Sequence, residues 1–134
     1  MIAFNEAEEV LMSILVGSGR SKMVCIEIVE DTDNVKVTQE RMLKDKRKHV
    51  ILMTYDVFCW VFTPERTRML EYLSNNNVGS ISDFARKLGR KFEEVHRDAK
   101  YLEGFSLVKL KREEANKVPY VDEDINIRIL SAKT

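Results

Sequence analysis

Residues 80–104 read SISDFARKLGRKFEEVHRDAKYLEG, and this stretch has the pattern of two short helices joined by a tight turn. Ser80 is a typical helix N-cap, and Asp83 stands three residues later, where an acidic side chain favours the start of a helix. Gly89 ends the first helix and Gly104 the second, because glycine is favoured just beyond a helix C-terminus. The apolar residues expected to face inward are Ile81, Phe84, Ala85 and Leu88 in the first helix, and Phe92, Val95, Ala99 and Leu102 in the second. Two helices joined in this way are typical of a helix-turn-helix.

The flanking sequence adds a helix before this pair and a β-hairpin after it. Residues 63–65 (TPE) are a strong helix start, because threonine caps, proline suits the first turn and glutamate favours the positive helix end. Residues 107–111 predict a strand, residues 112–117 its polar turn, and the alternating residues 125–130 (INIRIL) the returning strand. Three helices followed by a hairpin is the order of a winged helix. We therefore expect an α+β fold, a winged helix-turn-helix of three helices plus a β-hairpin wing.

The N-terminal half is read as an α/β extension. Residues 5–16 place apolar side chains at helical spacing and predict a helix, whereas residues 23–29 (MVCIEIV) alternate and predict a strand. Residues 35–53 are read as a polar connection leading into a buried segment, and the basic run 41–48 within it as a solvated face or, alternatively, a second contact to DNA or RNA. The aromatic residues 55–62 (YDVFCWVF) predict a short helix that packs in the core or contributes to the seam of a dimer.

The predicted organisation is therefore a helix-strand extension over residues 1–53 and a winged helix-turn-helix over residues 54–134. The extension is the expected region for dimerisation or for binding another partner. Charge is divided between the two parts, although the whole chain has a net charge of zero. Residues 1–34 have a net charge of −5, whereas residues 86–112 have a net charge of +5, so the positive field is confined to one part of the chain.

Composition excludes several classes of protein. The chain has 134 residues, of which 44% are hydrophobic and 33% charged, as in a soluble globular protein. No apolar run approaches the roughly 20 residues that span a bilayer, and the acidic start is unlike a signal peptide. Cys25 and Cys59 have neither metal-binding nor disulfide spacing, so a reduced, cytoplasmic location is expected. With no phosphate-binding glycine loop, zinc spacing or nucleophile motif, we expect no enzyme activity, metal or cofactor.

Several separated blocks resemble the winged helix-turn-helix transcriptional regulators of bacteria and archaea, of the MarR/ArsR-like kind. The blocks are Thr63-Pro64-Glu65-Arg66, residues 81–90 (ISDFARKLGR), Val95-His96-Arg97-Asp98, Tyr101-Leu102-Glu103, Val118-Pro119-Tyr120 and Ile125-Asn126-Ile127. The resemblance covers roughly residues 54–130. One departure is Ser106, where the family usually has glycine just before Leu-Val, at the turn from the third helix into the wing.

This resemblance implies a sequence-specific regulator that binds double-stranded DNA as a homodimer. The third helix would lie in the major groove, and the wing would contact the backbone or the minor groove. The candidate DNA-binding residues are Ser80, Arg90, Lys91, Glu94, His96, Arg97, Lys100, Lys109, Lys111 and Arg112. Other roles stay open: Arg97 in a local ion pair with Asp98, His96 as a surface histidine, and the wing cations as merely solvated.

A protein-binding module is the alternative function. Winged helices also serve as protein-interaction domains, and a net charge of zero permits that role. Some relatives are antitoxins, in which DNA binding would coexist with binding of a toxin by the N-terminal half. A continuous positive stripe over the third helix and the wing favours DNA, whereas mixed charge beside an exposed apolar patch favours a protein partner.

Overall fold

The computed structural model describes residues 8–17, 19–20, 22–29 and 49–132, which form two compact units. The sheet unit is built mainly from strands near both ends of the sequence. The helical unit comprises residues 17–22 and 61–124. Residues 30–48, and with them most of the polar connection expected at 35–53, lie outside the described residues.

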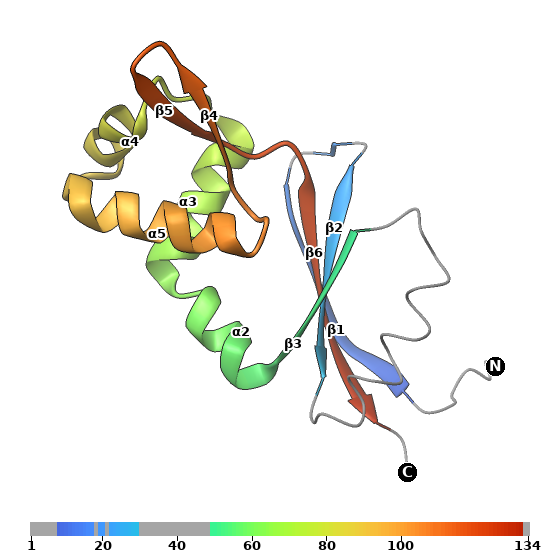
Figure 1. Ribbon diagram of the computed structural model, residues 1–134. Helices are drawn as coiled ribbons and strands as arrows, with labels where there is room; N and C mark the ends of the chain where they lie inside the picture. Colours follow the sequence, from blue (N-terminus) through green and yellow to red (C-terminus); the bar gives the residue numbers. More distant parts are fainter. Residues whose placement is uncertain (1–7, 18, 21, 30–48, 133–134) are drawn as a thin grey trace. The chain divides into compact units, whose positions relative to one another are not determined.

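The sheet unit is a mixed four-stranded sheet in the order β1-β6-β2-β3 (Figure 1). Its strands are β1 (Glu8–Val16), β6 (Asp124–Ala132), β2 (Met23–Val29) and β3 (His49–Thr54). β1 and β6 pair antiparallel, whereas β2 and β3 pair parallel with Val24 opposite His49. Residues 24–29 of β2 are buried on both faces, as is usual for an interior strand with parallel pairing. The strand expected at residues 23–29 is confirmed.

The helix expected over residues 5–16 is wrong, because residues 8–16 form β1. Their apolar positions fit a helical stripe, but an isolated helix of this length is only marginally stable in water. In the sheet, the backbone of β1 pairs with β6 from Glu8–Ala132 to Val16–Ile125. This pairing joins segments more than one hundred residues apart, so a local pattern could not reveal it.

The returning strand of the hairpin is also placed differently from the expectation. Residues 125–130 belong to β6 in the sheet unit. The hairpin is instead made by β4 (Lys109–Glu113) and β5 (Asn116–Tyr120), which pair antiparallel from Lys109–Tyr120 to Glu113–Asn116. Pro119 lies within β5, which a two-stranded hairpin tolerates because neither strand is interior.

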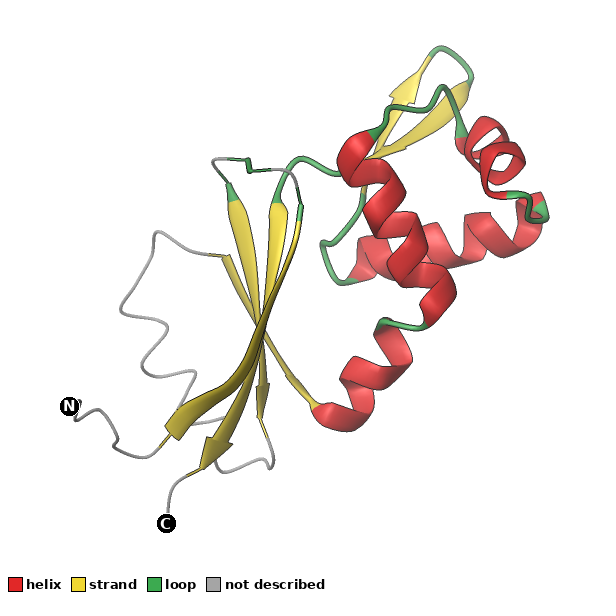
Figure 2. Cartoon of the chain, turned by 180° about the vertical axis from the view of Figure 1, so that it is seen from behind, coloured by secondary structure: helices red, strands yellow, loops and turns green. Residues whose placement is uncertain are grey.

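The described residues contain four helices, one more than the three of the expected module. They are α2 (Tyr55–Val61), α3 (Pro64–Asn75), α4 (Ile81–Leu88) and α5 (Phe92–Gly104). Figure 2 shows α3, α4 and α5 gathered together with the hairpin beside them, and β5 contacts both α3 and α4. α2, the short helix expected at residues 55–62, directly follows β3.

The predicted helix ends are confirmed by their local geometry. The hydroxyl of Thr63 accepts a hydrogen bond from the backbone N–H of Arg66, at 3.3 Å, and the hydroxyl of Ser80 accepts one from the N–H of Asp83, at 3.0 Å. Gly89 ends α4 in the left-handed conformation, with φ 69°. Glycine adopts the left-handed conformation at the lowest conformational energy. The sharp turn that results allows α5 to begin only three residues later.

The core of the helical unit lies where its three helices and the hairpin meet. Its buried apolar residues are Met69, Leu70 and Leu73 of α3, Ile81, Phe84 and Ala85 of α4, Val95, Ala99 and Leu102 of α5, and Leu107, Val108, Val118 and Val121 around the hairpin. Ala85 and Ala99 are small, which lets α4 and α5 approach closely. This core fixes α5 against α4 and leaves one face of α5 toward solvent.

A buried carboxylate, Asp124, holds Gly19 and Arg20 in the helical unit. Asp124 is 1% exposed, and its Oδ2 accepts hydrogen bonds from the backbone N–H groups of Gly19 and Arg20, at 2.9 and 2.8 Å. The Arg20 guanidinium donates to Asp124 Oδ1 at 3.3 Å and to the carbonyl of Ser74 at 2.9 Å. Gly17 is required beside it, because a Cβ there would lie 2.1 Å from Asp124 Oδ1.

Candidate nucleic-acid interface

The two faces of α5 differ in burial and chemistry. Val95, Ala99 and Leu102 are fully buried, as expected from their spacing. Phe92, expected on the same face, is 44% exposed, and the position at the other edge of the buried stripe is taken by Asp98. Apolar residues spaced three to four apart define the centre of a buried helix face but not which of its two edges is also buried. Here the partners of Asp98 decide that its edge is the buried one.

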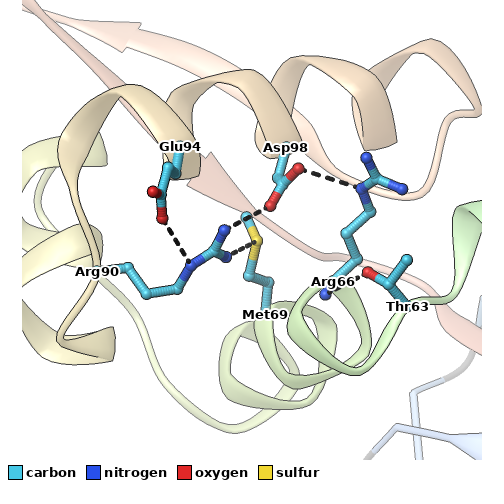
Figure 3. Close-up of polar contacts among 6 residues, drawn as sticks. All are labelled: Thr63, Arg66, Met69, Arg90, Glu94 and Asp98. Carbon is cyan, nitrogen blue, oxygen red and sulfur yellow. Dashed lines mark hydrogen bonds and ion pairs between the residues drawn. The ribbon is translucent and has the colours of Figure 1, made fainter.

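Asp98 receives two arginines, one from α3 and one from the turn before α5, and we call these three residues the Asp98 cluster (Figure 3). Its Oδ1 lies 3.2 Å from Arg66 Nε, and its Oδ2 lies 2.8 Å from Arg90 Nη2. The cluster joins α3 to α5, and Arg66 also stacks over the ring of Tyr101 at 4.2 Å. Charge-assisted hydrogen bonds of this kind are stronger than neutral ones, so the cluster fixes the position of α5.

Arg90 and Glu94 therefore act within the protein fold, although both were expected at a DNA contact. Besides its bond to Asp98, Arg90 donates to the Met69 sulfur at 3.4 Å and lies 3.8 Å from Glu94 Oε1. Its guanidinium is largely buried, with the side chain 18% exposed. Asp98 pairs with Arg66 and Arg90, which leaves Arg97 out of the local ion pair considered from the sequence.

Two exposed cations of this region have no ion-pair partner in the described part of the chain. They are Lys91, at the N-cap position of α5, and Arg97, on the outward side of the helix. Glu93 lies on the same side as Arg97 and is also exposed. Lys100, further along, is 3.2 Å from Glu103 and is exposed enough for that pair to exchange readily with water or another anion.

A groove of about 280 Å³ separates the start of α5 from the hairpin, and Ser80 of the α4 N-cap lies at its edge. Phe92 and His96 line the α5 side, with their rings stacked at a centroid distance of 5.6 Å. Arg112 and Lys117 line the hairpin side. Neither of these hairpin cations has an ion-pair partner among residues 8–17, 19–20, 22–29 and 49–132.

Lys117 and Arg112 stand directly opposite each other across the hairpin. Like charges at opposed positions destabilise a two-stranded ribbon, so their placement is unfavourable for the isolated hairpin. A bound polyanion removes that cost. Sequence reasoning placed Lys117 at the far end of the same turn as Arg112 and did not include it in the site; the correct strand register is the signal that would have placed it beside Arg112.

The other hairpin cations are held in exposed ion pairs. Lys109 Nζ is 2.7 Å from Asp122 Oδ1 and 3.6 Å from Glu123 Oε1. The hydrogen bond between them lowers the pKa of Asp122 and raises the pKa of Lys109. Lys111 is 3.1 Å from Glu113 and lies 5.4 Å from the Tyr120 ring centroid. The seven expected cations thus fall into two classes: Lys91, Arg97 and Arg112 have no ion-pair partner among the described residues, whereas Arg90, Lys100, Lys109 and Lys111 are paired.

A second depression, of about 590 Å³, lies on the opposite flank of α5. It is bordered by Arg66 and Arg68 of α3 and by Glu94 and Arg97 of α5. The exposed side of α5 therefore stands as a ridge between two hollows. A ridge made by one helix suits a groove about 12 Å wide, the width of the DNA major groove.

Other kinds of site were sought in the same residues. No group of His, Cys, Asp and Glu among the described residues could hold a metal ion. Cys25 is buried and Cys59 exposed, and neither forms a disulfide in the described part of the structure. The helices described here include none long and apolar enough to cross a membrane.

Comparison with known proteins identifies the family. The model of the family HVO_A0114 matches residues 61–127, half of the chain, and the chain belongs to this family. A solved structure, "Crystal structure of the predicted DNA-binding transcriptional regulator from E. coli", is similar at a TM-score of 0.46 and 12% identity, over 69% of this chain and 85% of that one. A comparison with the curated proteins finds no match.

Proposed function

We propose that the chain is a DNA-binding transcriptional regulator whose helical unit works as a winged helix-turn-helix. In this proposal α4 and α5 are the helix-turn-helix, α5 enters the major groove, and the β4–β5 hairpin is the wing. The observation that carries the proposal is a set of four cations that have no ion-pair partner in the described part of the chain: Lys91 and Arg97 at α5, and Arg112 and Lys117 on the hairpin.

The arrangement of these cations fits a duplex better than a small anion. Lys91 lies at the N-terminal end of α5, where the helix dipole and the free backbone N–H groups also attract phosphate. Arg97 lies further along the outward side, in reach of base edges once the helix is in the groove. Arg112 and Lys117 stand across a separate hollow, as needed for a neighbouring stretch of backbone.

The test is the salt dependence of binding to duplex DNA by the whole chain, measured by fluorescence anisotropy. If each helical unit neutralises about four to six phosphates, the affinity should fall with a log–log slope of about −4 to −5 for every helical unit that is bound to the duplex. The double variant Lys91→Ala, Arg112→Ala should reduce the magnitude of that slope by about two for every helical unit bound. A matched control is Lys111→Ala, whose cation is already paired with Glu113 and whose effect on the slope should be smaller. A flat salt response of the unaltered chain would refute the proposal.

We also propose that the regulator binds DNA as a homodimer, with α2 contributing to the contact. Tyr55 and Trp60 on this helix are 57% and 66% exposed, and Val57 is exposed as well. Exposed aromatic side chains are enriched at protein interfaces. Sedimentation velocity should give a dimer that Trp60→Ser weakens; a monomer at the concentrations used for DNA binding would refute this part.

The same exposed helix is the observation in favour of the alternative, a module that binds a protein partner such as a toxin. The two readings differ in what α2 does for DNA binding. If α2 makes the homodimer, Trp60→Ser should weaken binding to a two-half-site duplex much more than binding to a single half-site. Equal binding to both duplexes, together with a monomeric protein, would favour the partner-binding role for α2.

A further inference from the structure

Phe92 is a large apolar side chain exposed at the place where the proposed regulator would meet DNA. The exposed large hydrophobic side chains among the described residues are Tyr55, Val57 and Trp60 of α2, and Phe92 of α5. Phe92 is thus alone in the helical unit in this respect within the described residues. It is also the first residue of α5, the end of the helix that enters a major groove most deeply.

The ring of Phe92 is held in a defined position. It stacks on His96, one turn further along α5, with an interplanar angle of 24°. Together the two rings form one wall of the 280 Å³ groove, whose other side carries Arg112 and Lys117. An apolar surface therefore lies beside two cations that are suited to phosphate. The apolar ring itself has no function in phosphate binding.

We propose that Phe92 contacts the 5-methyl group of a thymine in the major groove and so selects a T·A pair at that position. The inference rests on the proposed function and adds one element of sequence preference to it. The thymine methyl is the apolar group that unmodified base pairs present in the major groove, and phenylalanine is one of the side chains that recognise it. His96 supports the ring and limits its rotation.

The experiment compares thymine with deoxyuridine, which lacks only that methyl group. A preferred duplex is first selected from random sequences with the whole chain. Each thymine is then replaced singly by deoxyuridine, and the dissociation constant is measured by anisotropy at fixed salt. At one position, or at two positions related by symmetry, the loss of the methyl should weaken binding about fourfold, as expected for one methyl group kept from water.

The variants assign that effect to Phe92. Phe92→Ala should bind the thymine and deoxyuridine duplexes equally, whereas Phe92→Leu should retain part of the difference. Because Phe92 is 44% exposed and does not belong to the buried core, both variants should fold, which circular dichroism checks. Lys91→Ala is the matched control: it should weaken both duplexes alike and leave their ratio unchanged.

The outcomes separate this inference from the function on which it rests. Salt-dependent duplex binding with no thymine–deoxyuridine difference at any position would overturn the thymine contact and leave the DNA-binding function standing. A difference that survives unchanged in Phe92→Ala would overturn it as well, since another residue would then read the methyl. Tighter binding to single strands, insensitive to the methyl, would replace it with stacking of an unpaired base on Phe92. Failure to bind any duplex would overturn both proposals.

Discussion

The Asp98 cluster and the outward side of α5 both contain basic residues, but these residues have different roles in the two places. In the cluster, Arg66 and Arg90 are bound to a carboxylate that lies on the buried side of α5. On the outward side, Lys91 and Arg97 have no carboxylate partner in the described part of the chain. Arginine in the first setting connects helices, whereas arginine in the second is available to a ligand. Position along the sequence does not distinguish them, because Arg90 and Lys91 are neighbours.

This comparison explains why the positive charge of residues 86–112 overstates the surface available to DNA. Part of that charge is neutralised by carboxylates of the protein itself. Asp98 pairs with Arg90, and Lys100, Lys109 and Lys111 each form an exposed ion pair. The remaining cations are few but are placed on a ridge and beside a groove. Their placement, more than their number, supports DNA binding.

The largest expected effect is on stability and comes from the cluster. Asp98→Asn would leave two largely buried guanidinium groups without a counter-charge, and should lower the free energy of unfolding by about 2–3 kcal/mol. Glu93→Gln makes the same carboxyl-to-amide change on the outward side of α5, and should stay within about 0.5 kcal/mol. Urea denaturation measures both. Equal losses in the two variants would erase the distinction between the faces.

The next effect is on binding and should come from the outward side. Arg97→Ala should weaken binding to the preferred duplex by about 1–3 kcal/mol if the guanidinium reads a base, with little change in the free energy of unfolding. Arg90→Ala should instead destabilise the fold, since it breaks the bond to Asp98. Anisotropy and denaturation on both variants test the contrast. An equal loss for Arg97→Ala on random DNA would reassign Arg97 to the phosphate backbone.

The smallest effect should come from Lys109, which is exposed but paired. The pKa of Asp122 is lowered and that of Lys109 raised, so each group is stabilised in its charged form. The contribution of Asp122 is present above its unfolded pKa of about 4 and is lost as pH falls through the lower folded value. The contribution of Lys109 is present below about pH 10 and is lost as pH rises through its folded value.

Lys109→Gln should therefore cost at most about 1 kcal/mol at pH 7, because the pair is partly exposed, and less at an acidic pH at which Asp122 is protonated. Denaturation at both pH values measures this difference. Lys117→Gln is the control on the paired strand: it relieves the repulsion with Arg112 and should not destabilise the hairpin. A loss in Lys109→Gln that persists undiminished at low pH would show that the pair is not its origin.

Sequence reasoning succeeded where structure depends on neighbouring residues. The caps Thr63 and Ser80 and the left-handed Gly89 are local devices, and all were predicted correctly. Ser106 belongs to the same class: it adopts φ 64°, which explains why relatives were expected to have glycine at that turn. The three helices after residue 63 follow from these signals and from the spacing of apolar residues.

The errors arose where distant segments decide. Residues 8–16 became a strand because β6 pairs with them, and β6 left the hairpin for the same reason. Phe92 was expected to be buried, but the buried stripe extends toward the opposite edge, where Asp98 is met by Arg66 from another helix. Lys117 became visible beside Arg112 only through the strand register. Apart from Lys117, each error concerns a contact with a residue that is distant in the sequence, which a local sequence pattern does not reveal.

The position of β6 has a consequence for the order in which the protein is made. β6 lies between β1 and β2, yet the ribosome synthesises it after the entire segment 61–124. A nascent chain that has emerged only as far as Tyr120 holds the two flanking strands without the strand that separates them. The helices can fold early from local contacts, but the sheet must wait, and until then its strands are exposed to mispairing with one another or with a second chain.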